Sequence, residues 1–151
     1  MSDEAVLAAG TVVKYSLTVG QSDFSAEKEV EGVISIGAVG EMSEAKERTV
    51  LKDKSKKYGA GMKDAPDKTI KFQRYPLNAD QNAFVAAAIA NKTVMIEVEY
   101  EAPVGASKGE VAVMEFKLLG FEKDDVTGED WQMGTINAKQ NSVEWTDAVP
   151  V

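Results

Sequence analysis

Strict alternation of apolar and polar residues recurs along this chain and predicts a mainly β protein. In residues 11–19, Val13, Tyr15, Leu17 and Val19 share one face, the pattern of a strand with one buried side. The same period is found in residues 29–39, 69–75, 92–101, 110–121 and 131–145. Strands that follow one another this closely pair antiparallel, so we predict two packed antiparallel sheets, as a β-sandwich or flattened barrel.

The second predicted strand is weaker than the others. Residues 29–39 place Val30, Ile34 and Ile36 on one face, but Gly32 and Gly37 interrupt the pattern and Gly40 follows it. Glycine inside a strand weakens or bends it.

One segment, residues 78–90, follows the 3.6-residue period of a helix instead. Asn78 is a suitable N-cap residue, and Gln81 three positions later completes a capping-box-like pair. The apolar stripe predicted to face the sheet consists of Phe84, Val85, Ala88 and Ile89. The pattern therefore predicts a single helix that flanks the sheets.

Between two predicted strands lies a polar connection, residues 41–68, with almost no apolar content. Connections this long are uncommon inside a compact domain. Its middle, residues 44–57, fits a short helix or a long hairpin, and the Tyr-Gly-Ala-Gly run at 58–61 is predicted to be flexible. We predict an arm that protrudes from a single domain spanning residues 1–151, with looser ends at residues 1–10 and 148–151.

The charge of the arm differs from that of the rest of the chain. It holds eight of the 17 basic and six of the 25 acidic residues, a net +2, whereas the other 123 residues hold nine and 19, a net −10. This asymmetry predicts docking onto a surface of opposite sign, including that of a second copy. The expected contact residues are Lys46, Arg48, Lys52, Lys54, Lys56, Lys57, Tyr58, Met62 and Lys63.

The composition excludes several kinds of chemistry. The chain has no cysteine and no histidine, so it lacks thiolate chemistry, disulfides and the usual general base and transition-metal ligand. No apolar run approaches the ~18 residues of a membrane span, and the acidic start has no signal-peptide pattern. We therefore expect a soluble protein made in the cytoplasm, with no cofactor and no membrane contact.

Two charged clusters each admit two interpretations. Asp124, Asp125, Glu129 and Asp130 offer oxygen ligands for Ca²⁺ but lack the spacing of a known calcium loop, which favours a solvated loop. The lysines of residues 52–57 resemble a nucleic-acid patch, but the patch has no arginine and no aromatic residue, which favours a protein contact or solubility.

Three glutamates alternate along one predicted strand, Glu97, Glu99 and Glu101. Catalytic carboxylates need opposed positions in a pocket that shifts their pKa values, whereas residues ~6.6 Å apart on one strand are more simply a water-facing side. The chain also has no Gly-rich phosphate loop and no G-x-S-x-G nucleophile motif. We therefore expect no enzyme.

The order of elements resembles the major tail tube proteins of long-tailed, non-contractile bacteriophages. The stretches that carry the resemblance are G-V-I-S-I-G-A-V-G at 32–40, E-R-T-V-L at 47–51, Y-G-A-G-M-K-D-A-P-D-K-T-I-K-F at 58–72, the helix at 78–90 and N-S-V-E-W-T at 141–146. Each is weak by itself, and their order and spacing together cover most of the chain.

The resemblance implies six subunits in a ring whose inner sheets join into one barrel. It implies stacked rings that form a virion tail tube, assembled from subunits made in the host bacterial cytoplasm and capped by other tail proteins. Double-stranded DNA would pass through without specific binding. The long loop, residues 41–68, would cross to the adjacent ring, helped by residues 1–10 and 148–151. Glu97, Glu99 and Glu101 are candidates for the lumen, the rival position being the outer surface.

Two other functions stay open on the sequence. The tube of a contractile injection system has a related architecture and would deliver protein. An immunoglobulin-like decoration or binding module would expose an aromatic-rich loop face, which this chain lacks.

Overall fold

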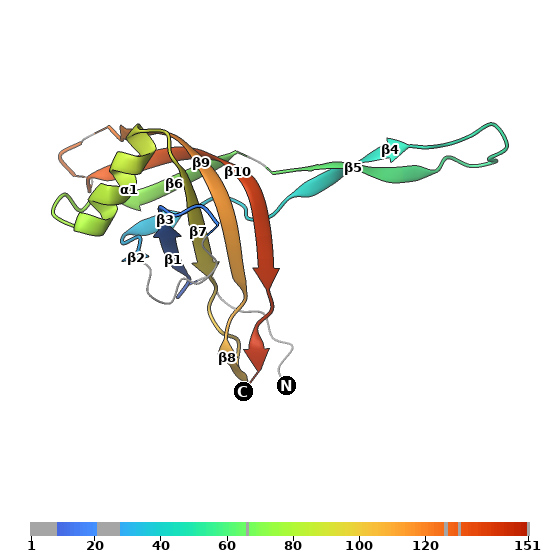
Figure 1. The fold of residues 1–151 in the computed structure, drawn as a ribbon. Helices are drawn as coiled ribbons and strands as arrows, with labels where there is room; N and C mark the ends of the chain where they lie inside the picture. Colours follow the sequence, from blue (N-terminus) through green and yellow to red (C-terminus); the bar gives the residue numbers. More distant parts are fainter. Residues whose placement is uncertain (1–8, 21–27, 66, 126, 130, 151) are drawn as a thin grey trace.

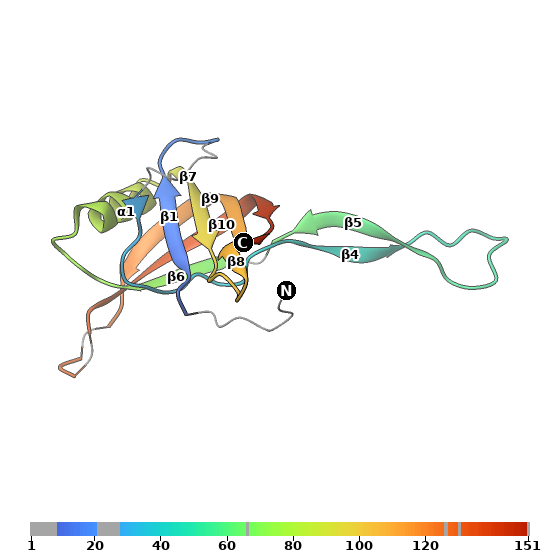
Figure 2. The ribbon, with the colours of Figure 1, turned by 90° about the horizontal axis from the view of Figure 1, so that it is seen from below.

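A computed structural model describes residues 9–20, 28–65, 67–125, 127–129 and 131–150 of the 151-residue chain. Its body is a curled seven-stranded antiparallel sheet with one helix at its side, and a hairpin arm extends from the body (Figures 1 and 2). The strand order is β2-β1-β7-β9-β10-β6-β3. The predicted fold class, mainly β with one flanking helix, is confirmed in the form of a flattened barrel.

The elements are as follows. The barrel strands are β1 (Val12–Ser16), β2 (Lys28–Glu29), β3 (Val33–Ser35), β6 (Lys68–Gln73), β7 (Thr93–Glu99), β9 (Val111–Lys123) and β10 (Met133–Thr146). The helix is α1 (Ala79–Ile89). Two further pairs of strands are β4 (Met42–Glu47) with β5 (Tyr58–Asp64), which form the arm, and β8 (Ala106–Lys108) with β11 (Val149–Pro150).

One short segment closes the barrel, because β2 and β3 are consecutive in the chain but lie at opposite edges of the sheet. Between them, the Val30 amide donates to the carbonyl of Val13 and the Gly32 carbonyl accepts from the amide of Gln73, both at 2.8 Å. The corner is at Gly32, whose φ of +76° suits glycine. A Cβ there would also lie 2.9 Å from the Gln73 carbonyl oxygen.

This corner overturns part of the prediction for residues 29–39. The segment is two short strands rather than one, so the alternation changes phase at Gly32. Val30 is buried and Ile36 packs partly against the core, as expected, but Ile34 is 59% exposed and Val33 takes the inward position.

The core fills the space inside the curled sheet. Val94, Ile96 and Val98 of β7 are at most 1% exposed, and the inward residues of β6 and β9 are equally enclosed, as predicted. The ring of Tyr15 packs against that of Phe84 from α1, with centroids 5.1 Å apart. The prediction was wrong for Leu17, Val19 and Ile89, which are about half exposed or more because β1 and α1 end where the sheet no longer covers them.

A buried glutamine anchors α1. Asn78 caps the helix by accepting from the Gln81 amide at 2.8 Å, as predicted. The Gln81 side chain does not complete the capping box. Its oxygen instead accepts from Arg74 Nη1 and from the Tyr75 amide, both at 2.7 Å, and its Nε2 donates to the carbonyls of Glu31 and Gln73. Gln81 therefore joins α1, the end of β6 and the closing corner.

The two ends of the barrel differ. The β6–α1 connection, the N-terminal part of α1 and the β9–β10 loop lie at the end that we call the helix end (Figures 1 and 2). The arm leaves from the opposite end, the arm end, where β8 and β11 extend β9 and β10. The predicted turn at 103–109 and the predicted tail at 148–151 thus contain paired strands, while residues 1–8 and 151 lie outside the described residues.

Candidate assembly surfaces

The arm is a two-stranded hairpin, which confirms the hairpin alternative for residues 44–57. β4 and β5 pair antiparallel with Ala45 opposite Ala60 and Lys46 opposite Gly59. The run at 58–61, predicted to be flexible, is part of β5. Its glycines leave room for long basic side chains: a Cβ at Gly61 would lie 3.2 Å from Lys46 Cε.

The tip of the arm is an ordered turn built around one aspartate. Asp53 Oδ2 accepts from the Val50 amide at 3.0 Å, and its Oδ1 lies 3.3 Å from Lys57 Nζ. The Asp53 amide donates to the Val50 carbonyl, and the Lys57 amide donates to Thr49 Oγ1 at 2.9 Å. The Asp53 side chain is only 9% exposed because the turn closes over it.

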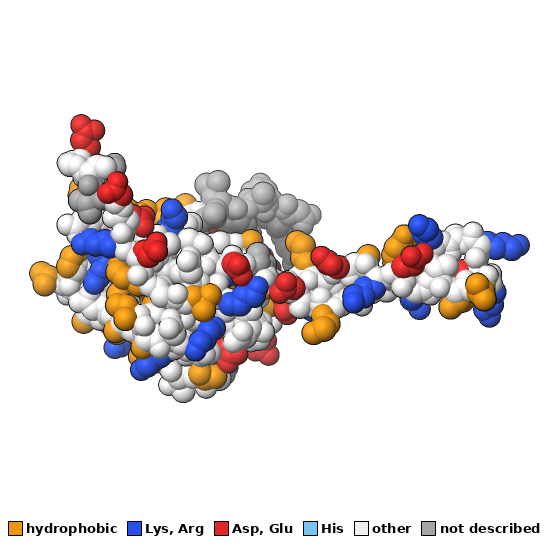
Figure 3. Space-filling model, turned by 90° about the horizontal axis from the view of Figure 1, so that it is seen from above, with side chains coloured by type: hydrophobic (Ala, Val, Ile, Leu, Met, Phe, Trp, Pro, Cys, Tyr) orange, Lys and Arg blue, Asp and Glu red, His pale blue; other side chains and the backbone are white. Residues whose placement is uncertain are grey.

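The basic residues predicted to make contacts are all exposed on this hairpin. They are Lys46, Arg48, Lys52, Lys54, Lys56, Lys57 and Lys63, and Figure 3 shows blue side chains along the length of the arm. Although the arm has few apolar residues, the structure shows that the large ones are exposed. Exposed fractions are 82% for Met42, 55% for Val50, 108% for Leu51, 56% for Tyr58 and 92% for Met62. The adjacent residues Val50 and Leu51 at the turn were not predicted as contact residues, although their apolar pair is visible in the sequence.

At the base of the arm an inward-facing lysine is buried. Lys68 is the first residue of β6, paired with Ala138, and is 1% exposed. Its Nζ has no hydrogen-bond partner among the described residues, nor has Oε1 of nearby Gln140. Burial lowers the pKa of Lys68. The alternation predicted that Ile70 and Phe72 face inward, but it gave no reason to expect the charged Lys68 on the same buried face.

The three candidate lumen residues lie in different environments. Glu97 is only 8% exposed because β7 is flanked on that face by Lys14 of β1 and Val113 of β9, which lie opposite it. Glu99 is half-buried at the last position of β7, and Glu101 is exposed beyond the strand. The outer face of β7 is therefore not the uniformly water-facing row that the alternation predicted.

The acidic loop does not gather its carboxylates. Among the described residues no group of three or more acidic side chains is placed to hold a metal ion. Asp124 instead accepts from Thr135 Oγ1 at 2.7 Å, while Asp125 and Glu129 are exposed. Asp130 lies outside the described residues.

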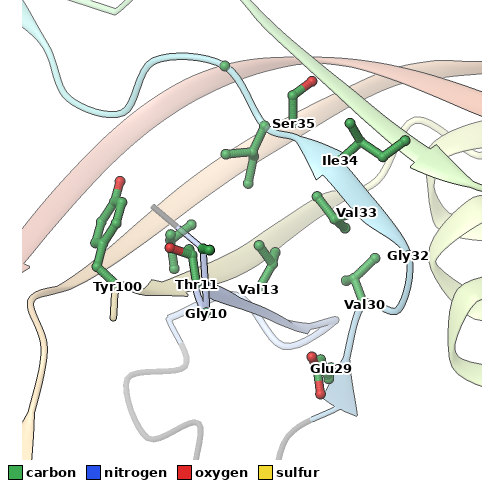
Figure 4. Close-up of a pocket in the computed structure, with 14 residues that line it drawn as sticks. Gly10, Thr11, Val13, Glu29, Val30, Gly32, Val33, Ile34, Ser35 and Tyr100 are labelled. Atoms are coloured by element: carbon green, nitrogen blue, oxygen red, sulfur yellow. The ribbon is translucent and has the colours of Figure 1, made fainter. Parts of the chain in front are cut away.

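A hollow of about 540 Å³ opens between β1 and the β2–β3 corner. Its lining mixes aliphatic and polar residues, and Val13, Val30 and Val33 gather around it (Figure 4). Among titratable side chains, Glu29 and Tyr100 reach its edge. Burial, with a smaller contribution from Glu110, raises the pKa of Tyr100.

In the part of the chain described here, no helix is long and apolar enough to cross a membrane.

Comparison with known proteins gives one family match. A model of the phage tail tube protein family matches residues 6–148. Among curated proteins no match is found.

Solved structures with the same fold include chains of the anti-feeding prophage and of an extracellular contractile injection system. A chain of the anti-feeding prophage baseplate, 6-fold symmetrised, superposes with a TM-score of 0.72 at 7% identity, over 97% of this chain and 98% of that one. A chain of the extended sheath-tube complex of the extracellular contractile injection system PVC gives 0.69 at 9%, over 96% and 93%. A chain of the anti-feeding prophage cap, which terminates the tube, gives 0.67 at 13%, over 98% and 95%.

Proposed function

Because this chain belongs to the phage tail tube protein family, we propose that it is the subunit of a virion tail tube built from stacked hexameric rings. The tube conducts double-stranded DNA into the host without binding it specifically. The role is structural rather than enzymatic. The arm, a basic hairpin held clear of an acidic body, is the observation that carries the stacking proposal (Figure 2).

The geometry of this arm supports the proposed stacking. A contact between two different surfaces of one protein continues as a ring or filament, and a positive arm on a negative body supplies two such surfaces. A two-stranded hairpin without further packing is only marginally stable in water. The arm is therefore expected to gain order when it docks on the adjacent ring.

The six-fold ring has support from the fold neighbours. One of them is a chain of a baseplate that is six-fold symmetrised, and another belongs to a sheath-tube complex. The β10 residues after Gln140 pair with β9 on one side, while their other side carries no strand among the described residues. Such an edge is a template for pairing with a neighbouring subunit, which would join the sheets of a ring into one barrel.

Electron microscopy and sedimentation test the assembly. We expect rings and, at higher protein concentration, tubes. Replacing residues 43–63 by Asn-Gly joins the paired residues Met42 and Asp64 through a two-residue hairpin turn. This armless chain should keep the thermal unfolding of the body and form rings that do not stack. Normal tubes from the armless chain would show that the arm is not the inter-ring contact.

Amide exchange tests the ordering of the arm. Backbone amides of β4 and β5 should exchange quickly in the isolated subunit and slowly in the tube, while those of β7 stay protected in both states. Equal exchange of the arm amides in the two states would contradict ordering upon docking.

For the lumen we propose the outer face of β1, β7 and β9, with Glu97, Glu99 and Glu101 at its acidic end. An acidic wall repels phosphates and lets DNA slide. Since Glu97 is nearly buried, the sharper test changes only Glu99 and Glu101 to lysine, which adds roughly 24 positive charges per six-subunit ring. Genome release should slow, whereas lysine at Glu31, which is exposed at the closing corner, should leave it unchanged. Normal release from intact particles with the first pair, or both glutamates facing outside solvent in a tube map, would overturn this assignment.

The second candidate function is the tube of a contractile injection system. It is favoured by one observation, namely that one of the fold neighbours described above is a chain of the sheath-tube complex of such a system. Purified native particles separate the two: a contractile sheath around the tube would support this candidate, and a bare tube would support the non-contractile one. The immunoglobulin-like module has no remaining basis, because the chain belongs to the tail tube family.

A further inference from the structure

The tip of the arm presents two apolar side chains on a turn that holds its shape internally. Leu51 is fully exposed and Val50 is 55% exposed. Moving these exposed apolar side chains from water into a contact with another apolar surface is favourable. Around them, residues 48–57 carry five basic groups and one acidic group, a net charge of +4.

The opposite end of the molecule carries a matching surface. We define the helix-end patch as Tyr75, Leu77 and Trp131, which are 39%, 99% and 80% exposed. The two chain segments that contribute it are held together, because the Arg74 amide donates to the Gln132 carbonyl at 2.8 Å. Figure 3 shows orange side chains on the body at the end away from the arm.

Acidic residues lie in the loop that leads into this patch. The β9–β10 loop that ends at Trp131 carries the exposed carboxylates of Asp125 and Glu129. Neither has a role in the fold that the described contacts reveal, and no metal-binding group forms there among the described residues. An apolar patch with an acidic loop leading into it complements an apolar tip with a basic border.

We propose that Val50 and Leu51 of one copy dock on the helix-end patch of a second copy, with Asp125 and Glu129 facing the tip lysines. The arm points away from its own helix end (Figures 1 and 2). A copy placed in the same orientation ahead of the arm therefore presents its helix end to the tip. This inference rests on the proposed stacking and assigns both halves of the contact. The apolar pair, rather than the lysines, holds the rings together, and the charges orient them.

Engineered cysteines test the pairing directly, because the chain has no cysteine of its own. A Leu51→Cys chain is mixed with a Leu77→Cys chain under conditions of tube formation and oxidised. The expected product is a disulfide-linked dimer of the two chains. In the control mixture the second chain is Val149→Cys, which is 46% exposed but at the arm end, and little dimer should form. Equal linking in both mixtures, or preferential linking to Val149→Cys, overturns the proposal.

Salt and serine variants test which part of the tip holds the contact. Leu51→Ser should raise the concentration needed for stacking by about tenfold or more, since a buried leucine contributes at least that factor in affinity. Lys54→Ser on the same tip should change it by less than about threefold. At 1 M salt, where screening is nearly complete, wild-type stacks should persist. Dissociation of wild-type stacks by salt, or a larger effect of Lys54→Ser, overturns the apolar anchor.

The failures of the two proposals are distinguishable. Wild-type protein that never forms rings or stacks refutes the proposed function. Stacking by wild-type protein without the link between Leu51→Cys and Leu77→Cys refutes only this docking arrangement.

Discussion

Replacing Lys68 by methionine should stabilise the fold. The Lys68 side chain lies inside the barrel, 1% exposed, and its Nζ has no hydrogen-bond partner among the described residues. Methionine has a similar length and flexibility and fills the same space without an ammonium group. The substitution therefore removes an uncompensated polar group and leaves the packing of the aliphatic stem almost unchanged.

The size of the effect follows from the cost of burying an unpaired polar group, which is about 1–3 kcal/mol in mutational data. In a chain of this size, 1 kcal/mol shifts Tm by about 2–4 °C. With a central value of about 2 kcal/mol, we expect Tm at pH 7 to rise by roughly 4–8 °C. Thermal unfolding of the dilute subunit, followed by circular dichroism, measures this shift.

The pH dependence gives a second readout with a definite sign. Burial lowers the pKa of Lys68 from 10.5, so between the lowered pKa and 10.5 the unfolded chain binds more protons than the folded chain. Wild-type stability therefore rises with pH in that window relative to the methionine variant. The advantage of Lys68→Met should be largest near neutral pH and should shrink as the pH approaches 10.5.

The matched control is Lys71→Met on the same strand, whose side chain is on the exposed face of β6. It should change the free energy of unfolding by no more than about 0.5 kcal/mol. An unchanged or lower Tm for Lys68→Met would refute the reasoning, because the ammonium group would then have a compensating partner in the folded protein.

Two further substitutions test how the barrel is closed. Gln81→Ala should cost about 2–4 kcal/mol in unfolding free energy, because four hydrogen bonds of a fully buried side chain are lost. The control Asn82→Ala, on the half-buried side of α1, should cost less. Equal losses of unfolding free energy for the two variants in denaturant titrations would contradict the central role of Gln81. Gly32→Ala should cost about 1–3 kcal/mol, since its φ is +76° and the new Cβ would meet the Gln73 carbonyl. Gly20→Ala, at φ +88° with no neighbour near the new Cβ, separates the backbone strain from the clash, and a smaller loss at Gly32 than at Gly20 would show that the corner relaxes.

Local patterns were enough to predict most of the elements. The strands at 69–75, 92–101 and 110–121 have a period of two that depends only on neighbouring residues, and the structure has β6, β7 and β9 there. The helix start at Asn78 was predictable for the same reason, because an N-cap is satisfied within one turn. The arm was predictable because residues 41–68 have very few apolar residues and a net positive charge, unlike the rest of the chain.

Within the candidate surfaces, the exposed lysines were predictable because nothing in the pattern would bury them. The apolar tip was missed because Val50 and Leu51 are only two residues in a polar run, and only the turn around Asp53 shows that both point outward. The helix-end patch joins residues more than 50 positions apart in the chain, so no local pattern could assemble it.

What the sequence determined by itself was therefore the set of strands, the capped helix and the opposite charges of arm and body, since each depends on side chains close together in the chain. Only the tertiary structure decided that residues 28–35 bridge both edges of the sheet, that Gln81 and Lys68 are buried, and that Leu17 and Ile34 are exposed. Those outcomes depend on which distant strand lies opposite each residue and on where the curled sheet stops covering it. Period-two alternation states that two faces exist, and the closure of the barrel decides which face is enclosed.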